Sequence, residues 1–390
     1  MSKLYNTQKE ITTNFRKFFS KHIPNIRKTQ LKILPEILFG IIKSESVSSF
    51  DIAKTLKDEF CFVQFDSITK RIRRFFNNEI FNPDEFYKSF ISHILANYKK
   101  KHLDKRVHLI FDHMFSHENY TVFMITMRIG KQGIPLWFRC FKGNDDSDAF
   151  ASKTITEGIT EVSNMFEGTG LELIFLADRW FNSTELLRHI DSLGHTYCIR
   201  LKKNIHVYPF DKKEGHIIQK NIGELSYFKY KSTTYQEISF TDERYITNIV
   251  FSDWKDVEEP WIIATNGDTR RAIKDYSYRF GGIETVFKNQ KTNGFNLEKI
   301  CNANITAFTT MYTLLCVCVT YLTLLGADYC KNSRCYKNEK IETHKTYIIN
   351  GKRIKKRIMS LFNTGLTLFN RAFCSCKYIR LPFNFILYDI

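Results

Sequence analysis

The chain lacks the patterns that identify several common classes of protein from sequence alone. Its ten cysteines are spread without a regular framework and form no two correctly spaced CxxC pairs with histidines, so we expect neither a disulfide scaffold nor a structural zinc site. Residues 1–15 contain no apolar signal core, and no internal repeat or low-complexity tract is evident. These absences predict a globular protein in a reducing cytoplasm.

Acidic residues are the minority charge. The 390 residues include 58 lysines and arginines against 41 aspartates and glutamates, which gives a formal net charge of +17. This excess favours a polyanionic partner, and nucleic acid is the first candidate. A solvated basic surface would give the same charge, so the assignment needs a site beside it. The length allows more than one domain, since domains commonly contain about 100 to 200 residues.

One uncharged apolar run, residues 307–327, is long enough to cross a bilayer, which takes about 20 residues. Its several threonines favour a buried core helix instead. No second run of this kind supports a membrane protein, so we expect no membrane association. The alternative predicts that the protein sediments with lipid.

Residues 27–101 carry apolar residues at helical spacing in four successive segments. Asp66 or Ser67 is expected to cap the third helix, whose exposed face is basic. The basic residues on this face are Lys70, Arg71, Arg73 and Arg74. A short helix, a turn and a basic helix are typical of a helix-turn-helix reader of DNA ends, and an ordinary helical bundle with a solvated basic face explains the same pattern. Both interpretations stay open.

From residue 106 the hydrophobic pattern changes from helical to strand-like. Three strand candidates are followed by a helix, a buried strand, a second helix and another strand. The first strand contains Asp112, and the fourth ends at Asp178. Residues 204–266 hold short polar strand candidates that do not continue this core, so we expect a β-rich insertion there.

The segment YSYRFGGIETVFKNQK, residues 276–291, combines a carboxylate with cations and aromatic rings. Glu284, Lys288 and Lys291 are spaced i, i+4 and i+7, so they share one face of a helix. A site that holds a metal and binds phosphates needs these groups on one surface. An exposed, salt-bridged helix face has the same spacing.

This segment resembles the signature of the DDE transposases of the insertion sequence four family, which have Tyr, two residues, Arg, three residues, Glu, six residues and Lys. Tyr276, Arg279, Glu284 and Lys291 repeat it, except that four residues separate Arg279 from Glu284. The resemblance covers roughly residues 25–375 and includes the segment LIFLADRWFNS around the second aspartate.

Two places depart from the family pattern. His113 and Met114 follow Asp112, where the family often has Thr or Ser. The extra residue before the glutamate lies beside Gly281 and Gly282, where backbone freedom is greatest. If these glycines do not absorb it, the arginine points away from the site.

The resemblance implies an α/β fold: a ribonuclease-H-like mixed-sheet core with a helical N-terminal domain and a β-rich insertion. The expected parts are a helical DNA-binding domain over residues 1–103, the catalytic core over residues 104–203 and 270–330, the β-rich insertion over residues 204–269, and a helical C-terminal region over residues 331–390.

The resemblance also implies that Asp112, Asp178 and Glu284 are the catalytic residues and hold two Mg²⁺ ions, for which Mn²⁺ can substitute. Two divalent ions about 3.5 to 4 Å apart, held by carboxylates, activate the attacking oxygen and stabilise the leaving oxygen of a phosphodiester. The residues expected to contact DNA are Tyr276, Arg279, Lys288, Lys291, Arg179, Lys70, Arg73 and Arg74.

Other candidates have structural explanations of equal or greater weight. His113, His117 and Glu118 lie close to the first aspartate and are possible metal ligands, but a histidine beside a strand end is more often packed or solvent-facing. An acidic cluster more often caps a following helix than binds metal, and it comprises Asp145, Asp146 and Asp148. Tryptophans that are able to stack on an unpaired base, or to pack in the core, are Trp180, Trp254 and Trp261.

The expected function is that of an insertion-sequence transposase. By resemblance, the protein binds the terminal inverted repeats of its element, cleaves DNA with a metal-activated water and joins the freed 3′ hydroxyl to target DNA. The expected partners are double-stranded DNA and a second copy of the chain, in the cytoplasm at the nucleoid. The alternatives are a DNA-binding protein with a decayed site, and a nuclease on the same core that cuts without joining.

Overall fold

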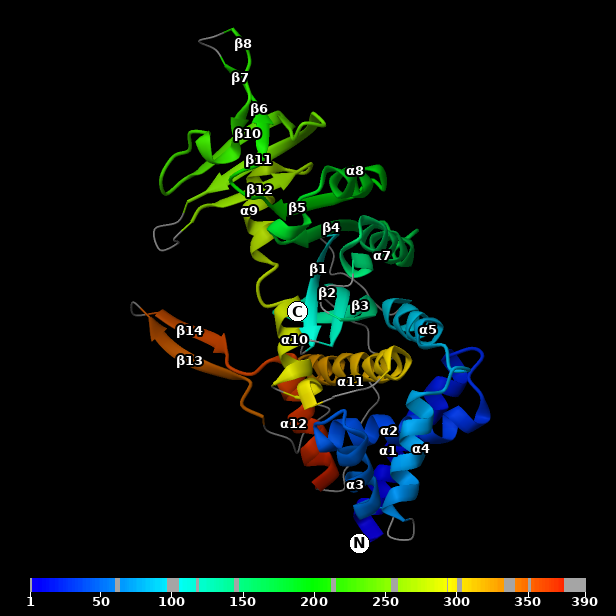
Figure 1. Cartoon of the computed structure of the whole chain (residues 1–390). Helices are drawn as coiled ribbons and strands as arrows, with labels where there is room; N and C mark the ends of the chain where they lie inside the picture. The colour runs from blue at the N-terminus through cyan, green and yellow to red at the C-terminus, as the bar shows by residue number, and fades with distance from the viewer. Residues whose placement is uncertain are drawn as a thin grey trace.

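A computed structural model of the chain describes residues 2–59, 64–96, 105–116, 119–143, 147–211, 215–253, 259–292, 294–299, 304–332, 341–349 and 352–374. Within these residues a large mixed sheet is covered by helices, and an N-terminal group of helices packs on one end of the assembly (Figure 1). The expected mixed α/β class is confirmed.

The main sheet has the strand order β3-β2-β1-β4-β5-β12-β11-β10-β6-β9. Its strands are β1 (Arg106–Ser116), β2 (Tyr120–Ile129), β3 (Gln132–Lys142), β4 (Glu172–Ala177), β5 (Thr196–Arg200), β6 (His206–Tyr208), β9 (Lys220–Asn221), β10 (Ser232–Phe240), β11 (Tyr245–Ser252) and β12 (Trp261–Thr265). A separate pair, β7 (Phe210–Asp211) and β8 (His216–Ile217), lies at the far tip of the molecule (Figure 1).

The first five strands form the part of the sheet that positions the site. β1 pairs antiparallel with β2 and β2 with β3, whereas β1, β4 and β5 run parallel. Almost every residue of β2 is buried, because this strand lies between two neighbours and is covered on both faces. The strand order and directions are consistent with the expected ribonuclease-H-like core.

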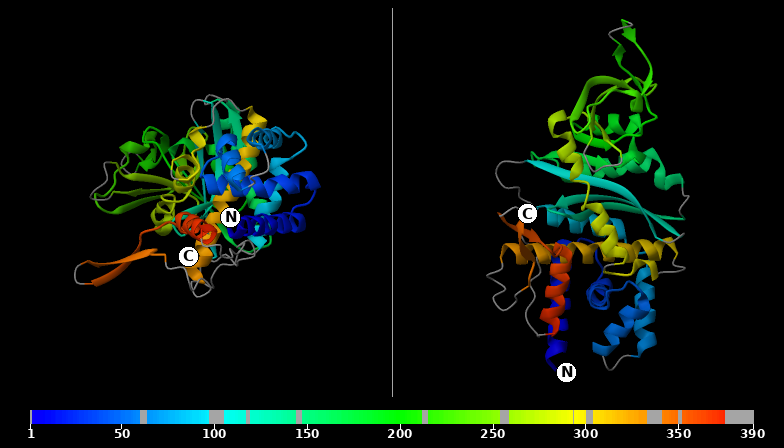
Figure 2. Two further views of the ribbon diagram at one scale, coloured as in Figure 1. Left: turned by 90° about the horizontal axis from the view of Figure 1, so that it is seen from below. Right: turned by 90° about the vertical axis from the view of Figure 1, so that its left-hand side faces the viewer.

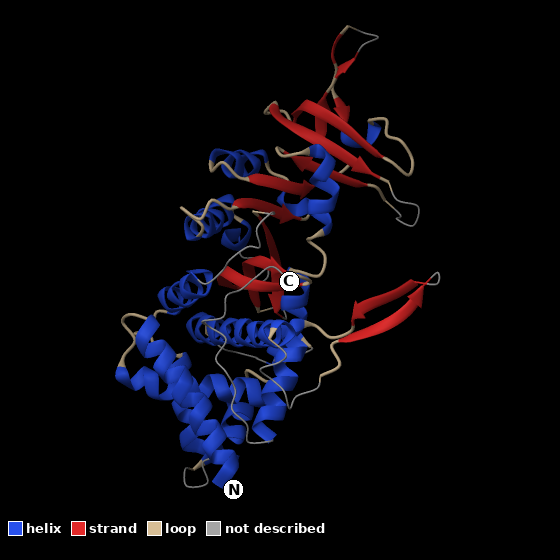
Figure 3. Cartoon of the chain, turned by 180° about the vertical axis from the view of Figure 1, so that it is seen from behind, coloured by secondary structure: helices blue, strands red, loops and turns tan. Residues whose placement is uncertain are grey.

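The β-rich insertion continues the core sheet, contrary to the expectation that residues 204–266 would not. β12 pairs antiparallel with β5, with Ala264 opposite Ile199, and β11 and β10 follow. The physical reason is the edge of β5, whose backbone groups need partners, and the apolar strand β12 supplies them with Ile262, Ile263 and Ala264 buried. A single sheet therefore runs from the core into the insertion (Figure 3).

The N-terminal region is helical, as expected. Its helices are α1 (Ser2–His22), α2 (Lys28–Ser44), α3 (Ser49–Glu59), α4 (Phe65–Phe76) and α5 (Pro83–Ala96). The predicted cap of α4 is wrong: Gln64 is the N-cap and makes no side-chain cap bond, and Asp66 lies inside the first turn. Apolar residues buried on one face, such as Ile68, Ile72 and Phe75, hold α4 against its neighbours.

The remaining helices flank the sheet or follow it. They are α6 (Ser147–Phe150), α7 (Ser152–Met165), the short 3₁₀ helix η1 (Arg179–Phe181), α8 (Thr184–Ser192), the 3₁₀ helix η2 (Ile222–Glu224), α9 (Thr269–Ser277), α10 (Ile283–Lys291), the 3₁₀ helix η3 (Leu297–Lys299), α11 (Ile305–Lys331) and α12 (Leu361–Cys374).

The long apolar helix α11 lies between the sheet and the N-terminal helices (Figure 2, right). Among the described residues it is the one helix long and apolar enough to cross a membrane by length and composition, and 94% of its most apolar window is buried inside the fold. It packs on β3 on one side and on α2, α4, α5 and α12 on others. Its apolar side chains therefore contact protein, as those of a core helix do.

Two glycines let α11 and α12 approach closely. A Cβ atom built on Gly326 would overlap the Leu361 carbonyl, and one built on Gly365 would overlap the Leu322 carbonyl. Neither glycine has a positive φ, so the requirement is space and not backbone conformation.

A Gly326→Ala variant is expected to lose about 1 to 3 kcal/mol of unfolding free energy through overpacking, although alanine is the better helix former. Urea denaturation followed by circular dichroism measures the change. Asn363→Ala, at an exposed position of α12, is the matched control and should leave stability nearly unchanged. Equal stability of both variants would show that the helix crossing is loosely packed.

The C-terminal region is not wholly helical. Residues 344–357 contain a two-stranded ribbon, β13 (His344–Ile349) and β14 (Lys352–Arg357), which precedes α12 and stands away from the body of the molecule (Figures 1 and 3). The expected helical region from residue 331 onward is wrong for this segment. β-branched and aromatic residues in HKTYII favour a strand, and the Asn-Gly pair in the sequence between the two strands is a strong hairpin signal.

Candidate active site

The first two carboxylates come from adjacent parallel strands. The last pair of the β1–β4 ladder is Ile110 with Leu176, and Asp112 and Asp178 each lie two residues further along. They are therefore level with each other where β4 ends, although β1 continues beside β2 as far as Ser116. The carboxyl ends of parallel strands are where sheets of this kind place their ligands. Asp178 also accepts a hydrogen bond from the Arg179 backbone nitrogen at 2.5 Å, which fixes the start of η1.

The third carboxylate, Glu284, lies in the first turn of α10. The chain reaches this helix through Gly281, whose φ of 79° favours glycine, and Gly282, where a Cβ atom would overlap the Ile110 side chain of β1. Glu284 accepts a hydrogen bond from the Gly281 backbone nitrogen at 2.9 Å. The two glycines thus place α10 directly against the strand that carries the first aspartate.

The Arg279 guanidinium lies among all three carboxylates. Its Nη2 is 2.8 Å from Asp112 Oδ2 and 3.7 Å from Asp178 Oδ2, and its Nη1 is 3.1 Å from Glu284 Oε1. Only 8% of the arginine side chain is exposed. The extra residue before Glu284 is absorbed in the Gly281–Gly282 turn, and Arg279 points into the site.

Burial raises the pKa of Asp112 above its ordinary value, and the neighbouring Asp178 and Glu284 raise it further. The Arg279 guanidinium and the backbone N–H of His113 act in the opposite direction but do not cancel the effect. Three carboxylates face one fixed positive charge, which leaves a formal excess of two negative charges when all are ionised. Such a site attracts further cations.

Three of the residues expected to contact DNA lie at different depths. Tyr276 is only 1% exposed and packs edge-on against Trp261 and Phe280, and burial raises its pKa to about 12. Lys288 is exposed on α10. Lys291 donates to the backbone carbonyl of Phe115 and lies 3.6 Å from Glu298. The two lysines do lie on the same side of α10 as the glutamate, but only Lys288 is open to solvent.

Next to Asp178 is a basic pocket that the sequence analysis found only in part. The expected Arg179 is half-exposed and lies 3.8 Å from Glu259. The same glutamate lies within 4 Å of Arg200 and of Lys203, at 3.9 and 3.4 Å. These side chains line a pocket of about 280 Å³. The basic stretch RLKK at the end of β5 was the available signal.

Trp180, two residues after Asp178, is 79% exposed, and the Lys202 ammonium lies 4.8 Å from the centre of its ring. Trp261, in contrast, is packed against Tyr276 and Phe280. Trp254 lies outside the described residues. Of the tryptophans considered for base stacking, Trp180 is the one whose ring is presented to solvent in the described part of the chain.

The basic face of α4 is exposed as expected, but it lies away from the three carboxylates. Lys70, Arg73 and Arg74 all point to solvent, and Arg73 donates to the Ser49 hydroxyl at 3.3 Å. α4 belongs to the N-terminal helices, on the opposite side of α11 from the sheet (Figure 1). The basic face of α4 is therefore a surface separate from the carboxylate site.

His113 is packed and does not face the carboxylates as a ligand. Its Nε2 is 2.8 Å from the Ala149 carbonyl oxygen, its ring stacks on Phe181, and burial lowers its pKa. His117 and Glu118 lie outside the described residues, as do Asp145 and Asp146. Asp148 lies in the first turn of α6, where an acidic residue is favourable.

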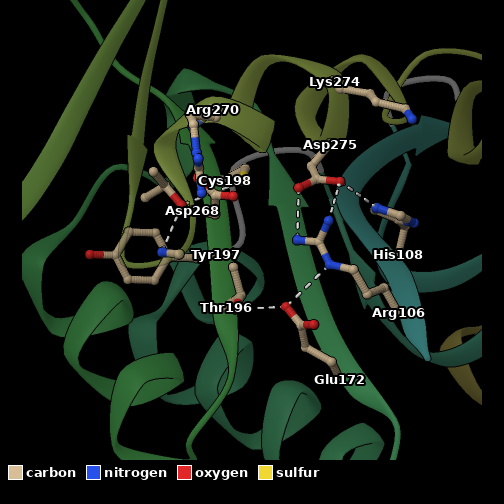
Figure 4. Close-up of polar contacts among 12 residues, drawn as sticks. Arg106, His108, Glu172, Thr196, Tyr197, Cys198, Asp268, Arg270, Lys274 and Asp275 are labelled. Carbon is tan, nitrogen blue, oxygen red and sulfur yellow. Dashed lines mark hydrogen bonds and ion pairs between the residues drawn. The ribbon is translucent and has the colours of Figure 1, made fainter. Parts of the chain in front are cut away.

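A buried ion pair joins β1 to α9, the helix that precedes Arg279. No sequence pattern predicted it. Arg106 donates to both oxygens of Asp275, at 3.0 and 2.8 Å, and His108 Nε2 is 3.0 Å from the same carboxylate (Figure 4). Arg106 also reaches Glu172 at 3.2 Å. The pair joins β1 and β4 to α9, the helix that leads to Arg279. In the sequence, Arg106 is one residue of the strand-like run RVHLIFD, and nothing near it indicates a partner. Only the fold shows that the partner is Asp275.

The donor set fits a hard divalent cation in its chemistry, because three carboxylates are ligands of the kind that Mg²⁺ takes. In this structure, however, the Arg279 guanidinium lies between them. Among the residues that the structure describes, no group of three or more His, Cys, Asp or Glu side chains is close enough to enclose one ion. The carboxylates that could hold metal are Asp112, Asp178 and Glu284, once the guanidinium no longer lies between them.

Comparison with known proteins gives the family. The model of the transposase DDE domain matches residues 105–320, a span that contains all three carboxylates, the basic pocket and the insertion. A search of curated proteins found no match. The family match covers more than half of the chain, and its boundaries enclose the site built above: this chain belongs to the family of transposase DDE domains and is a transposase.

Proposed function

We propose that the protein is an insertion-sequence transposase, of the insertion sequence four family, that cleaves DNA at the ends of its element and joins them to target DNA. The observation that carries this proposal is the convergence of Asp112, Asp178 and Glu284 on one guanidinium, from two adjacent parallel strands and the start of a helix. The Tyr, Arg, Glu and Lys spacing of residues 276–291 supports the choice of family.

The three carboxylates are proposed to hold Mg²⁺, or Mn²⁺ in its place. When bound, the metal supplies an activated water and stabilises the leaving oxygen of the phosphodiester. The chain's own contribution is to hold the carboxylates on rigid elements: two on neighbouring strands and one on a helix locked to β1 by Gly282. This rigidity keeps the ligand positions fixed while DNA binds.

Arg279 is proposed to exchange partners when DNA and metal arrive. In the present structure it neutralises part of the carboxylate charge; a phosphate oxygen offers its fork the same bidentate geometry. Lys288 and the pocket formed by Arg179, Arg200 and Lys203 then bind the flanking phosphates. Trp180 is expected to stack on an unpaired base beside the cleavage point, because its ring is exposed and lies next to Asp178.

The wider context follows from the same proposal. The protein acts at the nucleoid in the cytoplasm as a homodimer that pairs two transposon ends, and the basic face of α4 contacts the inverted repeat. The resemblance to the insertion sequence four family also implies a hairpin intermediate, through which its members often pass.

Product analysis tests the proposal directly. Purified protein is incubated with Mg²⁺, a duplex ending in the inverted repeats that flank the coding region, and a supercoiled target plasmid. A transposase yields both nicked ends and strand-transfer products joined to the plasmid. Cleaved ends without joined products would identify a nuclease on this core instead, and DNA binding without cleavage would identify a decayed site.

The role of Arg279 gives a prediction that does not depend on activity. An Arg279→Gln variant leaves three carboxylates without their internal cation, so a divalent ion relieves more repulsion there than in the wild type. We expect Mg²⁺ to raise the melting temperature of the variant more than that of the wild type, as measured by differential scanning fluorimetry. Arg270→Gln is the control, since that side chain is 89% exposed and pairs with Asp268. Equal shifts in all three proteins would contradict the proposed exchange.

A further inference from the structure

The ribbon β13–β14 carries a concentrated positive charge outside the span matched by the family model. Residues 344–357 contain six lysines and arginines, one histidine and no acidic residue. Lys345, Arg353, Lys355 and Lys356 are all exposed. The ribbon projects from the segment before α12 and stands clear of the main sheet in two opposite views (Figures 1 and 3).

The register of the two strands places like charges opposite each other. Lys345 is directly across from Lys356, a pairing that is destabilising in an isolated ribbon. Burial, and then the positive charges of Arg357 and Lys355, lower the pKa of His344 below its ordinary value. The positive charges therefore repel one another along the ribbon, and an anionic partner would relieve that repulsion.

The cations lie on both faces of the ribbon. Successive residues of a strand point to opposite faces, so Lys345 and Lys356 share one face, while Arg353 and Lys355 lie on the other. A flat anionic surface such as a membrane would be met by one charged face only. In the major groove of DNA, which is wide enough for a two-stranded ribbon, the face of Lys345 and Lys356 turns to the base edges. The long side chains of Arg353 and Lys355 on the other face are able to reach phosphates at the walls of the groove.

The apolar residues fit the same partner. Tyr347 and Ile354 form a cross-strand pair on one face, each 39% exposed, with cations before and after them. Apolar side chains on a ribbon in the major groove contact base edges such as the thymine methyl group. Each strand of six residues extends about 20 Å, roughly half a turn of the duplex.

We propose that β13–β14 is a DNA-binding arm that lies in the major groove of double-stranded DNA, separate from the carboxylate site and from the basic face of α4. The proposal rests on the proposed function only in taking DNA as the polyanion. The arm's phosphate contacts strengthen DNA binding without regard to base sequence. Its Tyr347–Ile354 pair contacts base edges.

The test measures binding by the full-length chain, with Asp178→Asn present so that no cleavage interferes. Fluorescence anisotropy with a 40-base-pair duplex, a probe length of about four helical turns, is followed over a series of salt concentrations. The arm variant combines Arg353→Gln, Lys355→Gln and Lys356→Gln. Losing three phosphate contacts should make the slope of log K against log salt less steep by roughly three and weaken binding at least about tenfold.

The matched control removes three exposed lysines of α1 with Lys9→Gln, Lys17→Gln and Lys21→Gln, which changes the net charge equally. The control should keep nearly the wild-type slope, and both variants should melt like the parent protein. Dimethyl sulfate protection of guanine N7 atoms, which face the major groove, should be reduced in the arm variant only.

Three results would overturn the proposal. The first is an unchanged slope and affinity in the arm variant. The second is an equal loss in the α1 control, which would show that net charge alone decides binding. The third is a loss of binding to vesicles containing phosphatidylserine without a loss on DNA, which would assign the arm to a membrane. In each case, strand cleavage is measured separately with protein that keeps Asp178. The arm proposal can therefore be contradicted while the proposed function is upheld.

Discussion

An Asp178→Asn variant is expected to lose strand cleavage by about a thousandfold or more, since metal-based stabilisation contributes several kcal/mol and each 1.4 kcal/mol corresponds to about tenfold in rate. Asparagine keeps the shape of the side chain and its position after β4 but removes the charge of an oxygen that is proposed to hold metal. DNA binding should be kept, because the change removes negative charge from a surface that phosphates approach. Cleavage of a repeat-ended duplex in Mg²⁺ and anisotropy with the same duplex measure the two properties.

The control for this experiment is Glu167→Gln, which removes one exposed carboxylate in the segment before β4. It should cleave at nearly the wild-type rate. If wild type and the Asp178 variant are equally inert while both bind DNA, the site is decayed and the enzyme proposal is lost. If the variant cleaves as well as the wild type, the carboxylate is not a metal ligand.

Replacing Arg106 with Met is expected to have the largest effect on stability. Its side chain and that of Asp275 are 8% and 3% exposed, and removing one partner of such a pair leaves a buried, uncompensated charge, at a cost of about 3 to 5 kcal/mol. Urea denaturation at neutral pH measures the loss. The double variant Arg106→Met, Asp275→Leu should recover much of it, because neither charge then remains buried.

The pH dependence of stability provides a second check on the same pair. Burial raises the pKa of Asp275, but hydrogen bonds from His108 and Arg106 outweigh it, so the pKa lies below the ordinary value. A lowered pKa in the folded state contributes stability that is present above the ordinary aspartate pKa and is lost as the pH falls through the lowered value. An Asp275→Asn variant should lack this part of the acid dependence. An unchanged acid limb in the urea data would show that the pair does not contribute.

The pair also matters for the site, since α9 carries Asp275 four residues before Arg279. When the Arg106–Asp275 pair is removed, the Arg279 guanidinium should no longer contact all three carboxylates. We therefore expect the double variant to fold but to cleave DNA more slowly than the wild type, with an altered Mg²⁺ requirement.

The hydrophobic pattern predicted most of the core elements. Strands around Asp112 and before Asp178, the helix of Glu284, and the buried helix over residues 307–327 all lie where periodicity indicates. These elements are predictable because apolar spacing reports directly on which face is buried. The position of Glu284, Lys288 and Lys291 on one face of α10 likewise follows from helix geometry alone.

Long-range pairing explains what the pattern did not predict. The joining of β12 to β5 depends on two strands about 60 residues apart meeting edge to edge, and nothing local in either strand specifies it. The ribbon β13–β14 lies in the C-terminal region, residues 331–390, that was expected to be helical. Its alternating register and its Asn-Gly pair were the local signals that favoured a hairpin.

The available chemistry can be read from the amino-acid sequence: three carboxylates, an arginine and lysines at set spacings around the third of them, and a strong excess of positive charge. How these groups meet depends on the fold. Arg279 is brought between Asp112, Asp178 and Glu284 because Gly281 turns the chain and Gly282 packs on β1, and Arg106 is neutralised because Asp275 comes from an element 169 residues away. Spacing along the chain fixes neighbours within one helix or strand, whereas contact between elements depends on packing that no single segment encodes.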